Sequence, residues 1–310
     1  MNFEPSYLKT LRQGLFPERI ENAYRILTYC TLCPRNCGVN RVKGEKGYCG
    51  AGLLPEVSSS GPHFGEEEPL VGIHGSGTIF FTHCNLKCGF CQNFSISHLG
   101  EGRPISLESL AKTMVELQHS GCHNINYVTP SHFVPQILKA LPLAAHMGLS
   151  VPLVYNTGGY DAPETLHLLD GIIDIYMPDF KFSRKDVAQE YCEAPDYPEA
   201  ARIAFKEMHR QVGDLILDDR GIACRGLLVR HLVLPEGLAG TEDIMRFLSR
   251  EVSGNTYINI MDQYHPCGEL PPRSALNRRI THSEFSNAVE AAKKMGLHRL
   301  DKRERFRIIR

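Results

Sequence analysis

The sequence lacks a substantial net charge and lacks any long apolar run. Its 34 lysines and arginines balance 35 aspartates and glutamates, which gives a formal net charge of -1 at pH 7. No general basic field therefore exists to hold a nucleic acid or an anionic membrane surface. No apolar run approaches the roughly 20 residues that cross a bilayer, and the N-terminal stretch carries acidic residues where a signal peptide is apolar. We expect a cytoplasmic protein without nucleic-acid or membrane partners.

Cysteine, by contrast, occurs 11 times in the 310 residues. In a reducing compartment a disulfide framework is not expected, so clustered cysteines indicate metal binding and scattered ones indicate packing. Two groups are clustered, which are Cys30, Cys33, Cys37 and Cys49, and then Cys84, Cys88 and Cys91. The scattered ones are Cys122, Cys192, Cys224 and Cys267. Cys267 alone among them is a candidate for catalysis, as a hydrogen-atom donor, because it follows His265 in the segment QYHPC.

Three regions are predicted along the chain. Apolar residues at helical spacing predict an N-terminal helical cap over residues 1–29. Residues 30–62 are rich in Gly, Cys, Pro and Ser, which predicts a four-cysteine loop module that requires a metal to order it. Residues 63–310 should form the main domain with a C-terminal extension. Within this domain, we expect the acidic segment GEEEP at 65–69 to be a solvated turn and the basic segment at 297–310 to be a solvated helix end.

Short β-branched or apolar runs alternate with amphipathic segments from Thr78 onward. The expected strands lie at 78–83, 123–130, 151–159, 172–182, 226–235 and 256–264, and the expected helices at 106–121, 133–146, 164–171, 198–212 and 242–252. Ser106 is the expected N-cap of the first of these helices, and Gly121 its end. Near-continuous apolar strands joined by right-handed helical crossovers predict an α/β fold, an open (β/α)6 partial barrel. Functional residues should then lie at the carboxyl ends of the strands.

The first of those strand ends carries Cys84, Cys88 and Cys91 with the spacing C-x3-C-x2-C. Three thiolates from one short loop suit three corners of a 4Fe-4S cluster and leave one iron without a protein ligand. A structural zinc ion requires four ligands, and His83 or His74 are candidates for the fourth. The strand-end position favours the cluster, with zinc as the alternative.

This loop also resembles the signature of the radical S-adenosylmethionine (radical SAM) superfamily, C-x3-C-x-aromatic-C, with Phe90 in the aromatic place. The resemblance implies an oxidoreductase in which S-adenosylmethionine chelates the open iron. One electron, supplied by a flavodoxin or ferredoxin, then cleaves the cofactor to methionine and a 5'-deoxyadenosyl radical, which abstracts hydrogen from a substrate. Iron-sulfur potentials reach down to about -700 mV, low enough for such a reduction.

Within the superfamily, residues 78–266 resemble the pyruvate formate-lyase activating enzymes and their uncharacterised relatives. The segments MPDFK, YNTGG, VRHLVLPEG and QYHP are similar to this group's motifs at strands three to six. The resemblance implies cofactor contacts from Asp179, Lys181, Arg230 and His265, and a monovalent cation bordered by Asn156, Thr157, Met177 and Asp179. Asn156 stands where the group has an acid. At strand two the group's G-G-E is replaced by VTPSH, so Thr129, Ser131 and His132 become the candidates for holding the cofactor's amino group.

The N-terminal cysteines, Cys30, Cys33, Cys37 and Cys49, have the spacing C-x2-C-x3-C-x11-C. Four thiolates make a closed site for either zinc or an auxiliary 4Fe-4S cluster, and the spacing does not separate the two. The entry sequence C-x-L-C-P-R-x-C also occurs in uncharacterised radical SAM relatives. We favour a cluster, because a second cluster would relay electrons to the first.

The functional prediction is a radical SAM enzyme that abstracts hydrogen from a protein or peptide, as in glycyl-radical-enzyme activation. Modification of a peptide or of a small molecule is the alternative within the class, because it would use the same cofactor residues. The alternative of another class is a non-catalytic zinc or iron-sulfur protein that binds a partner through its basic C-terminal segment.

Overall fold

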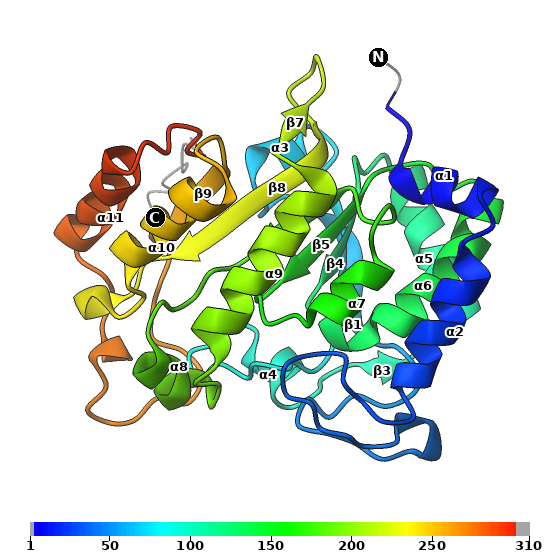
Figure 1. The fold of residues 1–310 in the computed structure, drawn as a ribbon, viewed down its shortest axis with the longest axis horizontal. Helices are drawn as coiled ribbons and strands as arrows, with labels where there is room; N and C mark the ends of the chain where they lie inside the picture. Colours follow the sequence, from blue (N-terminus) through cyan, green and yellow to red (C-terminus); the bar gives the residue numbers. More distant parts are fainter. Residues whose placement is uncertain (1–2, 302–310) are drawn as a thin grey trace.

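The computed structural model describes residues 3–301 and contains a nine-stranded mixed sheet flanked by helices (Figure 1). The strands are β1 (Glu56–His63), β2 (Ser76–Phe81), β3 (Arg103–Pro104), β4 (Ile125–Val128), β5 (Leu153–Thr157), β6 (Ile175–Pro178), β7 (Ile216–Leu217), β8 (Ala223–Leu232) and β9 (Tyr257–Met261). The helices are α1 (Ser6–Arg12), α2 (Phe16–Ile26), α3 (Glu68–Val71), α4 (Phe94–Ser97), α5 (Leu107–His119), α6 (Val134–His146), α7 (Pro163–Leu168), α8 (Lys185–Cys192), α9 (Tyr197–Val212), α10 (Thr241–Phe247) and α11 (His282–Lys294).

Strands β2, β4, β5, β6, β8 and β9 are parallel neighbours that follow one another in chain order. Antiparallel strands flank them, with β1 beside β2 and β7 beside the start of β8. The predicted alternation of parallel strands and helices is therefore present, and the carboxyl ends of six strands meet along one edge. Closure into a (β/α)6 partial barrel stays a prediction.

Burial on both faces explains why these strands read as continuous apolar runs. All five residues of β5 are buried, and four buried residues make up β6.

Capping residues and glycines set the helix boundaries. The Ser106 side chain accepts a hydrogen bond from the Ser109 backbone N–H at 3.1 Å, which confirms the predicted N-cap of α5. Gly171, with φ of 70°, lies just after α7, where only glycine adopts that conformation without strain.

The N-terminal region differs from the sequence prediction at one boundary. Residues 56–63 form the strand β1, which pairs along the full length of β2, so the irregular cysteine-rich segment ends near residue 55 instead of 62. The alternation of exposed and partly buried residues in β1 is weak, because β1 lies near the sheet edge, and this explains why its sequence reads as a loop.

The C-terminal extension contains α11, a helix that was not predicted. Its start has a capping box, in which Thr281 accepts from the Glu284 backbone N–H and Glu284 accepts from Thr281. The Thr-x-x-Glu pattern in the sequence indicates the start of this helix.

Most of the basic segment, residues 302–310, lies outside the described residues. Within residues 3–301, no helix combines the length and the apolar character needed to cross a membrane.

Candidate functional site

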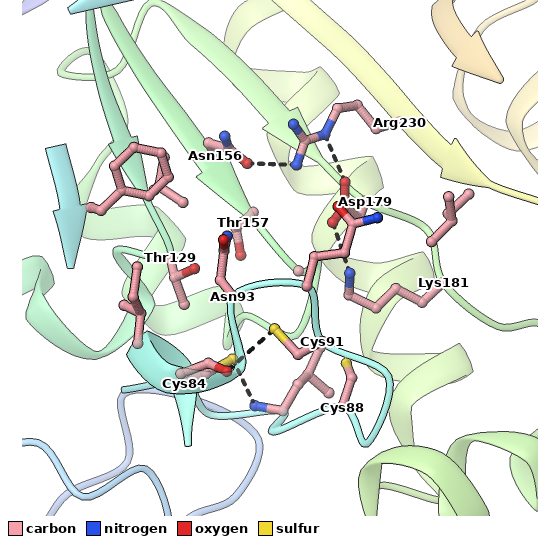
Figure 2. Close-up of a pocket in the computed structure, with 18 of the residues that line it drawn as sticks. Cys84, Cys88, Cys91, Asn93, Thr129, Asn156, Thr157, Asp179, Lys181 and Arg230 are labelled. Atoms are coloured by element: carbon pink, nitrogen blue, oxygen red, sulfur yellow. Dashed lines mark hydrogen bonds and ion pairs between the residues drawn. The ribbon is translucent and has the colours of Figure 1, made fainter. Parts of the chain in front are cut away.

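A cavity of about 400 Å³ lies at the carboxyl ends of the parallel strands. This volume falls within the range of small-molecule sites, about 300–1,000 Å³. The predicted site residues that line it are Cys84, Cys88, Phe90, Cys91, Thr129, Asn156, Thr157, Asp179, Lys181 and Arg230 (Figure 2). Residues from the ends of four strands, β4, β5, β6 and β8, and from one cysteine loop therefore meet in one place.

The three cysteines follow β2 on a single loop. Cys84 Sγ accepts the Leu86 backbone N–H at 3.4 Å, and Cys91 Sγ accepts the Ser97 hydroxyl at 3.2 Å. Burial raises the pKa of the Cys84 thiol to about 12 and also raises the pKa of Cys91. Any metal bound here must therefore displace protons from the thiols.

The arrangement of these thiols fits a cluster better than a single metal ion. Among the residues from 3 to 301, no three His, Cys, Asp or Glu side chains converge as ligands of one ion. A 4Fe-4S cluster does not require such convergence, because each thiolate binds a different iron. The two candidates for a fourth zinc ligand have other contacts, since His83 Nε2 pairs with Glu56 at 3.2 Å and the His74 ring packs against His123.

Cys192, at the end of α8, places a fourth sulfur beside the loop. Its Sγ lies 3.2 Å from Cys88 Sγ, and this contact, followed by burial, raises the pKa of Cys88 well above its usual range. The Cys192 thiol donates a hydrogen bond to Cys88, so it would act as a hydrogen-bonding neighbour of the Cys88 thiolate when a cluster is held here. Cys192 is not among the residues that line the cavity, so the cavity itself offers three cysteines, Cys84, Cys88 and Cys91, that would hold a cluster.

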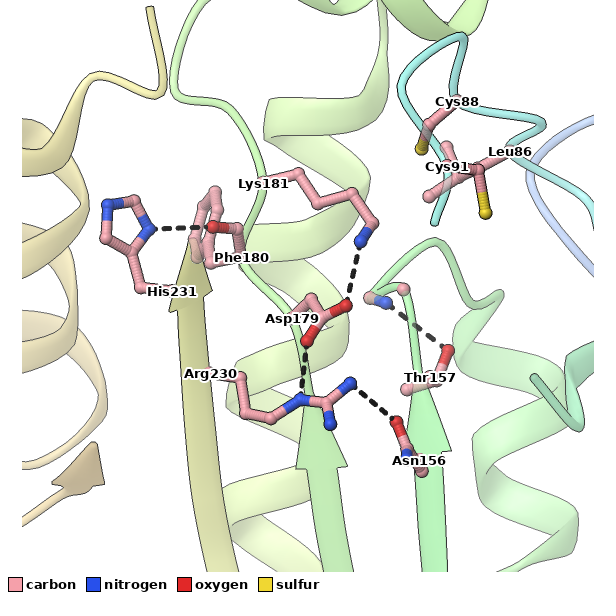
Figure 3. Close-up of polar contacts among 12 residues, drawn as sticks. Leu86, Cys88, Cys91, Asn156, Thr157, Asp179, Phe180, Lys181, Arg230 and His231 are labelled. Atoms are coloured by element: carbon pink, nitrogen blue, oxygen red, sulfur yellow. Dashed lines mark hydrogen bonds and ion pairs between the residues drawn. The ribbon is translucent and has the colours of Figure 1, made fainter. Parts of the chain in front are cut away.

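Opposite the cysteine loop, Asp179 is held between two cations (Figure 3). Arg230 Nε donates to Asp179 Oδ1 at 2.7 Å, and Lys181 Nζ donates to Oδ2 at 2.8 Å. Burial alone would raise the pKa of Asp179, but Arg230 and Lys181 outweigh it and lower that pKa to about 2. Burial likewise opposes the charge of Lys181 and Arg230, yet Asp179 raises the pKa of both. All three groups are therefore ionised at neutral pH.

The acidic segment at 65–69 is not a solvated turn, so that prediction is wrong. Glu66 is 7% exposed and pairs through Oε2 with Arg230 Nη1 at 3.2 Å on the cavity wall. Glu67 is 2% exposed and accepts Asn259 Nδ2 at 2.7 Å. Leu70, which follows these acids in the sequence, is fully buried. An apolar residue next to the acidic run was therefore the sequence feature that could have indicated burial of this segment.

Asn156 and Thr157, at the end of β5, connect the charged groups to a buried network. Asn156 Oδ1 accepts Arg230 Nη2 at 3.0 Å. The hydroxyls of Thr157 and Ser131 each donate to the buried Asp161 carboxylate at 2.6 Å, so Ser131 supports the site from behind. Because Arg230 and Lys181 occupy both oxygens of Asp179, the monovalent cation stays a prediction. Asp161 itself was not predicted, because it lies beyond the strand-end motif.

Three residues around the cavity have strained backbones. His83, Lys87 and Thr129 have φ values of 68°, 48° and 56°, in the left-handed region that side chains disfavour. Thr129 is β-branched, and its backbone N–H is held by the Asn156 carbonyl at 2.8 Å. Such strain persists where the surroundings enforce it, and it gathers at functional sites.

Some predicted site residues lie away from the cavity. Met177 is fully buried in the core, and His132 lines a second, smaller cavity beside the N-terminal cysteines. His265 Nδ1 lies 3.3 Å from the Gln263 carbonyl, and Cys267 Sγ donates to the Phe90 carbonyl at 3.1 Å. The roles of these four residues as cofactor contacts or hydrogen-atom donors stay predictions.

The comparisons with known proteins place the chain in a family. It is 31% identical over 304 residues to "Uncharacterized protein MJ0674" of Methanocaldococcus jannaschii, covering 96% of this chain and 83% of that protein. The chain therefore belongs to the same protein family as MJ0674. No protein-family profile matches the sequence.

Solved structures of radical SAM enzymes resemble the chain more remotely. TsrM from Kitasatospora setae, a radical SAM methyltransferase solved with cobalamin and a [4Fe-4S] cluster, gives a TM-score of 0.44 at 13% identity over 60% of this chain and 34% of its own. The cobalamin-dependent OxsB gives a TM-score of 0.39 at 14% sequence identity, covering 71% of this chain and 31% of its own. The [FeFe]-hydrogenase maturase HydG gives a TM-score of 0.47 at 13% sequence identity, covering 72% of this chain and 49% of its own. The chain spans about a third to a half of each of these proteins. At TM-scores below 0.5 these likenesses do not decide the chemistry, which rests on the residues of the site.

Proposed function

We propose that the protein is a radical SAM enzyme. The observation that carries this proposal is the three-cysteine loop of Cys84, Cys88 and Cys91, which faces one cavity together with Asp179 and Arg230. When bound there, a 4Fe-4S cluster with one open iron supplies the electron that cleaves S-adenosylmethionine to methionine and a 5'-deoxyadenosyl radical.

The wall of the cavity suits the charges of this cofactor. Lys181 and Arg230 provide cations for its carboxylate, and Glu66 and Asp179 provide carboxylates for its ammonium and sulfonium groups. Because the two cations and the two carboxylates already pair with each other, the site holds no excess charge before the cofactor arrives. Buried opposite charges in a fixed arrangement favour a zwitterionic ligand over a simple anion or cation.

Apolar residues complete the cavity. Phe81, Leu86 and Leu234 line it and are each at most 2% exposed, so they are well-packed parts of the wall. Phe90 is anchored by edge-on contacts with Phe182 and Tyr191 at ring-centre distances of 5.8 and 6.3 Å, which fix the cysteine loop against the domain. A firm apolar wall excludes water and protects a reactive carbon radical from side reactions.

For the substrate, we propose a protein or peptide from which hydrogen is abstracted at a glycine Cα. The support is the resemblance of the strand-end segments around Asn156, Asp179 and Arg230 to the pyruvate formate-lyase activating enzymes. The reaction would convert the glycine to a carbon-centred radical and the 5'-deoxyadenosyl radical to 5'-deoxyadenosine, with the hydrogen atom passing from the first to the second.

The test of the class is the anaerobic production of 5'-deoxyadenosine. Protein reconstituted with iron and sulfide, and reduced with dithionite, should cleave S-adenosylmethionine, and Cys88→Ala should abolish the product. Cys224→Ala is the matched control, because Cys224 is partly exposed and lines neither cavity. Metal analysis showing zinc alone, or cleavage that survives in Cys88→Ala, would overturn the proposal and favour a non-catalytic metal protein.

The substrate class has its own test. Glycine-containing peptides and candidate glycyl-radical enzymes would be incubated with the reduced protein, and electron paramagnetic resonance would be used to look for the doublet of a glycyl radical. Glycine deuterated at Cα should transfer deuterium to 5'-deoxyadenosine. Deuterium transfer from another residue or from a small molecule would replace this substrate while leaving the enzyme class intact.

A further inference from the structure

The four N-terminal cysteines surround a second cavity. It has a volume of about 10 Å³, enough for one water-sized sphere. The residues that line it include Cys30, Cys33, Cys37, Cys49, Arg41 and His132. Thiols spread over 20 residues of irregular chain are thus brought together around one space, and this is the arrangement that a metal centre requires.

Arg41 gives this cavity a buried positive charge. The residue is 1% exposed, and its guanidinium donates to the Gly52 and His132 carbonyls, with the contact to His132 at 2.7 Å. In the part of the chain that the structure describes, the partners of the Arg41 guanidinium are backbone carbonyls and not carboxylates. Burial raises the pKa of the Cys49 thiol, and the charge of Arg41 opposes that effect. Because a buried cation is costly without a counter-charge, an anionic group is expected in the adjacent cavity.

The four thiols can serve either candidate metal. Zinc holds four thiolates at about 2.3 Å from its centre, whereas a cubane core lies between its thiolates and keeps them further apart. The cavity is lined by the four cysteines that either metal centre requires. A redox-active centre would also explain why this segment contacts the Cys84 loop, so we favour the cluster.

Polar groups around the cavity suit bound sulfur. The Tyr48 backbone N–H donates to Cys37 Sγ at 3.4 Å. Burial raises the pKa of the Cys33 and Cys49 thiols, and the nearby backbone N–H groups of Arg35 and Ala51 offset part of that effect. Such donors stabilise the negative charge of a cluster and tune its potential.

The module also contacts the loop of the first site directly. Arg35, between the second and third cysteines, donates through Nε to the Asn85 carbonyl at 2.9 Å and through Nη2 to the Cys192 carbonyl at 2.6 Å. Burial raises the pKa of the Cys33 thiol, and the side chain of Asn85, the residue that follows Cys84, offsets part of that effect. One side chain therefore bridges the two groups of cysteines.

We propose that the N-terminal cysteines bind a second 4Fe-4S cluster that passes single electrons to the cluster of the Cys84 loop. The donor is a low-potential carrier of the flavodoxin or ferredoxin class, which is oxidised by one electron for each electron that reaches the Cys84 loop. No proton or atom is transferred in this step. The proposed identity of the metal does not depend on the proposed radical SAM function, whereas the proposed transfer of electrons does.

The metal is tested in a chain that lacks the first site. The triple variant Cys84→Ala, Cys88→Ala and Cys91→Ala keeps the four N-terminal cysteines, and after anaerobic reconstitution it should hold about four irons and about four sulfides per chain. Reduction should give the paramagnetic signal of a 4Fe-4S cluster. One zinc per chain, or no bound metal, would overturn the proposal whether or not the wild-type protein cleaves S-adenosylmethionine.

The electron path is tested by the rate of cluster reduction. In Cys33→Ser, reduction of the Cys84-loop cluster by flavodoxin hydroquinone should slow by roughly tenfold, while dithionite, a small diffusible reductant, should still reduce that cluster at the wild-type rate. Cys224→Ser controls for the loss of a thiol elsewhere. Equal flavodoxin rates in Cys33→Ser and wild type would overturn the relay, and Cys37→Ser, which removes another of the four thiolates, repeats the test if Cys33→Ser fails to fold.

Discussion

At the residue scale, the contact between Cys192 and Cys88 predicts a shift in redox potential. Once Cys88 is a thiolate, Cys192 must donate the hydrogen bond across the 3.2 Å between the two sulfur atoms. A donor to a ligand sulfur favours the more negative, reduced cluster, so Cys192→Ala should lower the midpoint potential. One hydrogen bond corresponds to a shift of roughly 20–60 mV for a one-electron couple.

The measurement is an anaerobic redox titration followed by electron paramagnetic resonance. Cys192→Ser keeps a donor at the same position and should fall between the wild type and Cys192→Ala. Cys192 is 1% exposed and remote from the solvent, so a change in hydration is a small contribution. An unchanged potential in Cys192→Ala would show that the thiol only packs against Cys88.

A site residue can be predicted from the sequence when a reactive or charged side chain lies at the carboxyl end of an apolar strand. Cys84, Asp179 and Arg230 follow or end apolar strands, and the fold brings those ends to one edge, so their meeting could be inferred without coordinates. Glu66 and Cys192 could not be inferred in this way. They reach the site from segments outside the parallel strands, and only tertiary packing decides which way their side chains face.

At the element scale, the segment after β9 clamps the cysteine loop. Glu269 N donates to the Gly89 carbonyl at 2.8 Å, and a Cβ on Gly268 would lie 2.2 Å from the same oxygen. Gly268 also has φ of 69°, so Gly268→Ala should strain the backbone and displace the loop. We expect the variant to lose at least about 2 kcal/mol of stability and to bind less iron after reconstitution.

The matched control is Gly237→Ala. Gly237 has a similar φ of 65°, but a Cβ there would meet no atom within 4 Å. This variant should show only the backbone strain of about 1–2 kcal/mol and a normal iron content. Urea unfolding and iron analysis of both variants make the comparison, and equal iron contents would mean that the clamp does not hold the loop.

Helices with a regular spacing of apolar residues could be predicted from the sequence. Elements that depend on contacts with distant segments could not. The helices α5, α6 and α9 lie where periodicity placed them, because each buries one apolar stripe against the sheet. Strand β1 and the short helices α3 and α4 lack such a stripe. They are stabilised by hydrogen bonds to neighbours that are distant in the sequence, which no local window contains.

At the scale of the whole molecule, stability should fall in mild acid because histidines are buried in the neutral form. His231 is fully buried, with Nδ1 on the Phe180 carbonyl and Nε2 on the Thr241 hydroxyl, both at 2.9 Å. Burial lowers its pKa to about 4, so between pH 6.5 and 4 the unfolded chain binds a proton that the folded chain does not. His231 therefore contributes stability above about pH 6.5, and this contribution is lost as the pH falls through that range.

The variant His231→Gln isolates the effect. Its unfolding free energy should depend less steeply on pH between 6.5 and 4, by up to about 1.4 kcal/mol per pH unit for one proton. Urea unfolding at pH 7, 6 and 5 under one anaerobic condition provides the measurement. Parallel curves for the variant and the wild type would mean that His231 titrates alike in both states.

The guanidinium groups of Arg35 and Arg41 have a consequence for how this protein can be shortened. Both extend from the N-terminal cysteine segment and bind carbonyls of the main domain, at Asn85 beside Cys84 and at His132 beyond the end of β4. Removing the residues before about residue 55 would therefore remove Arg35, which hydrogen-bonds the Asn85 carbonyl of the cysteine loop. A truncated chain without the N-terminal segment should lose the shape of the first site as well as the second, so the smallest working fragment has to retain it.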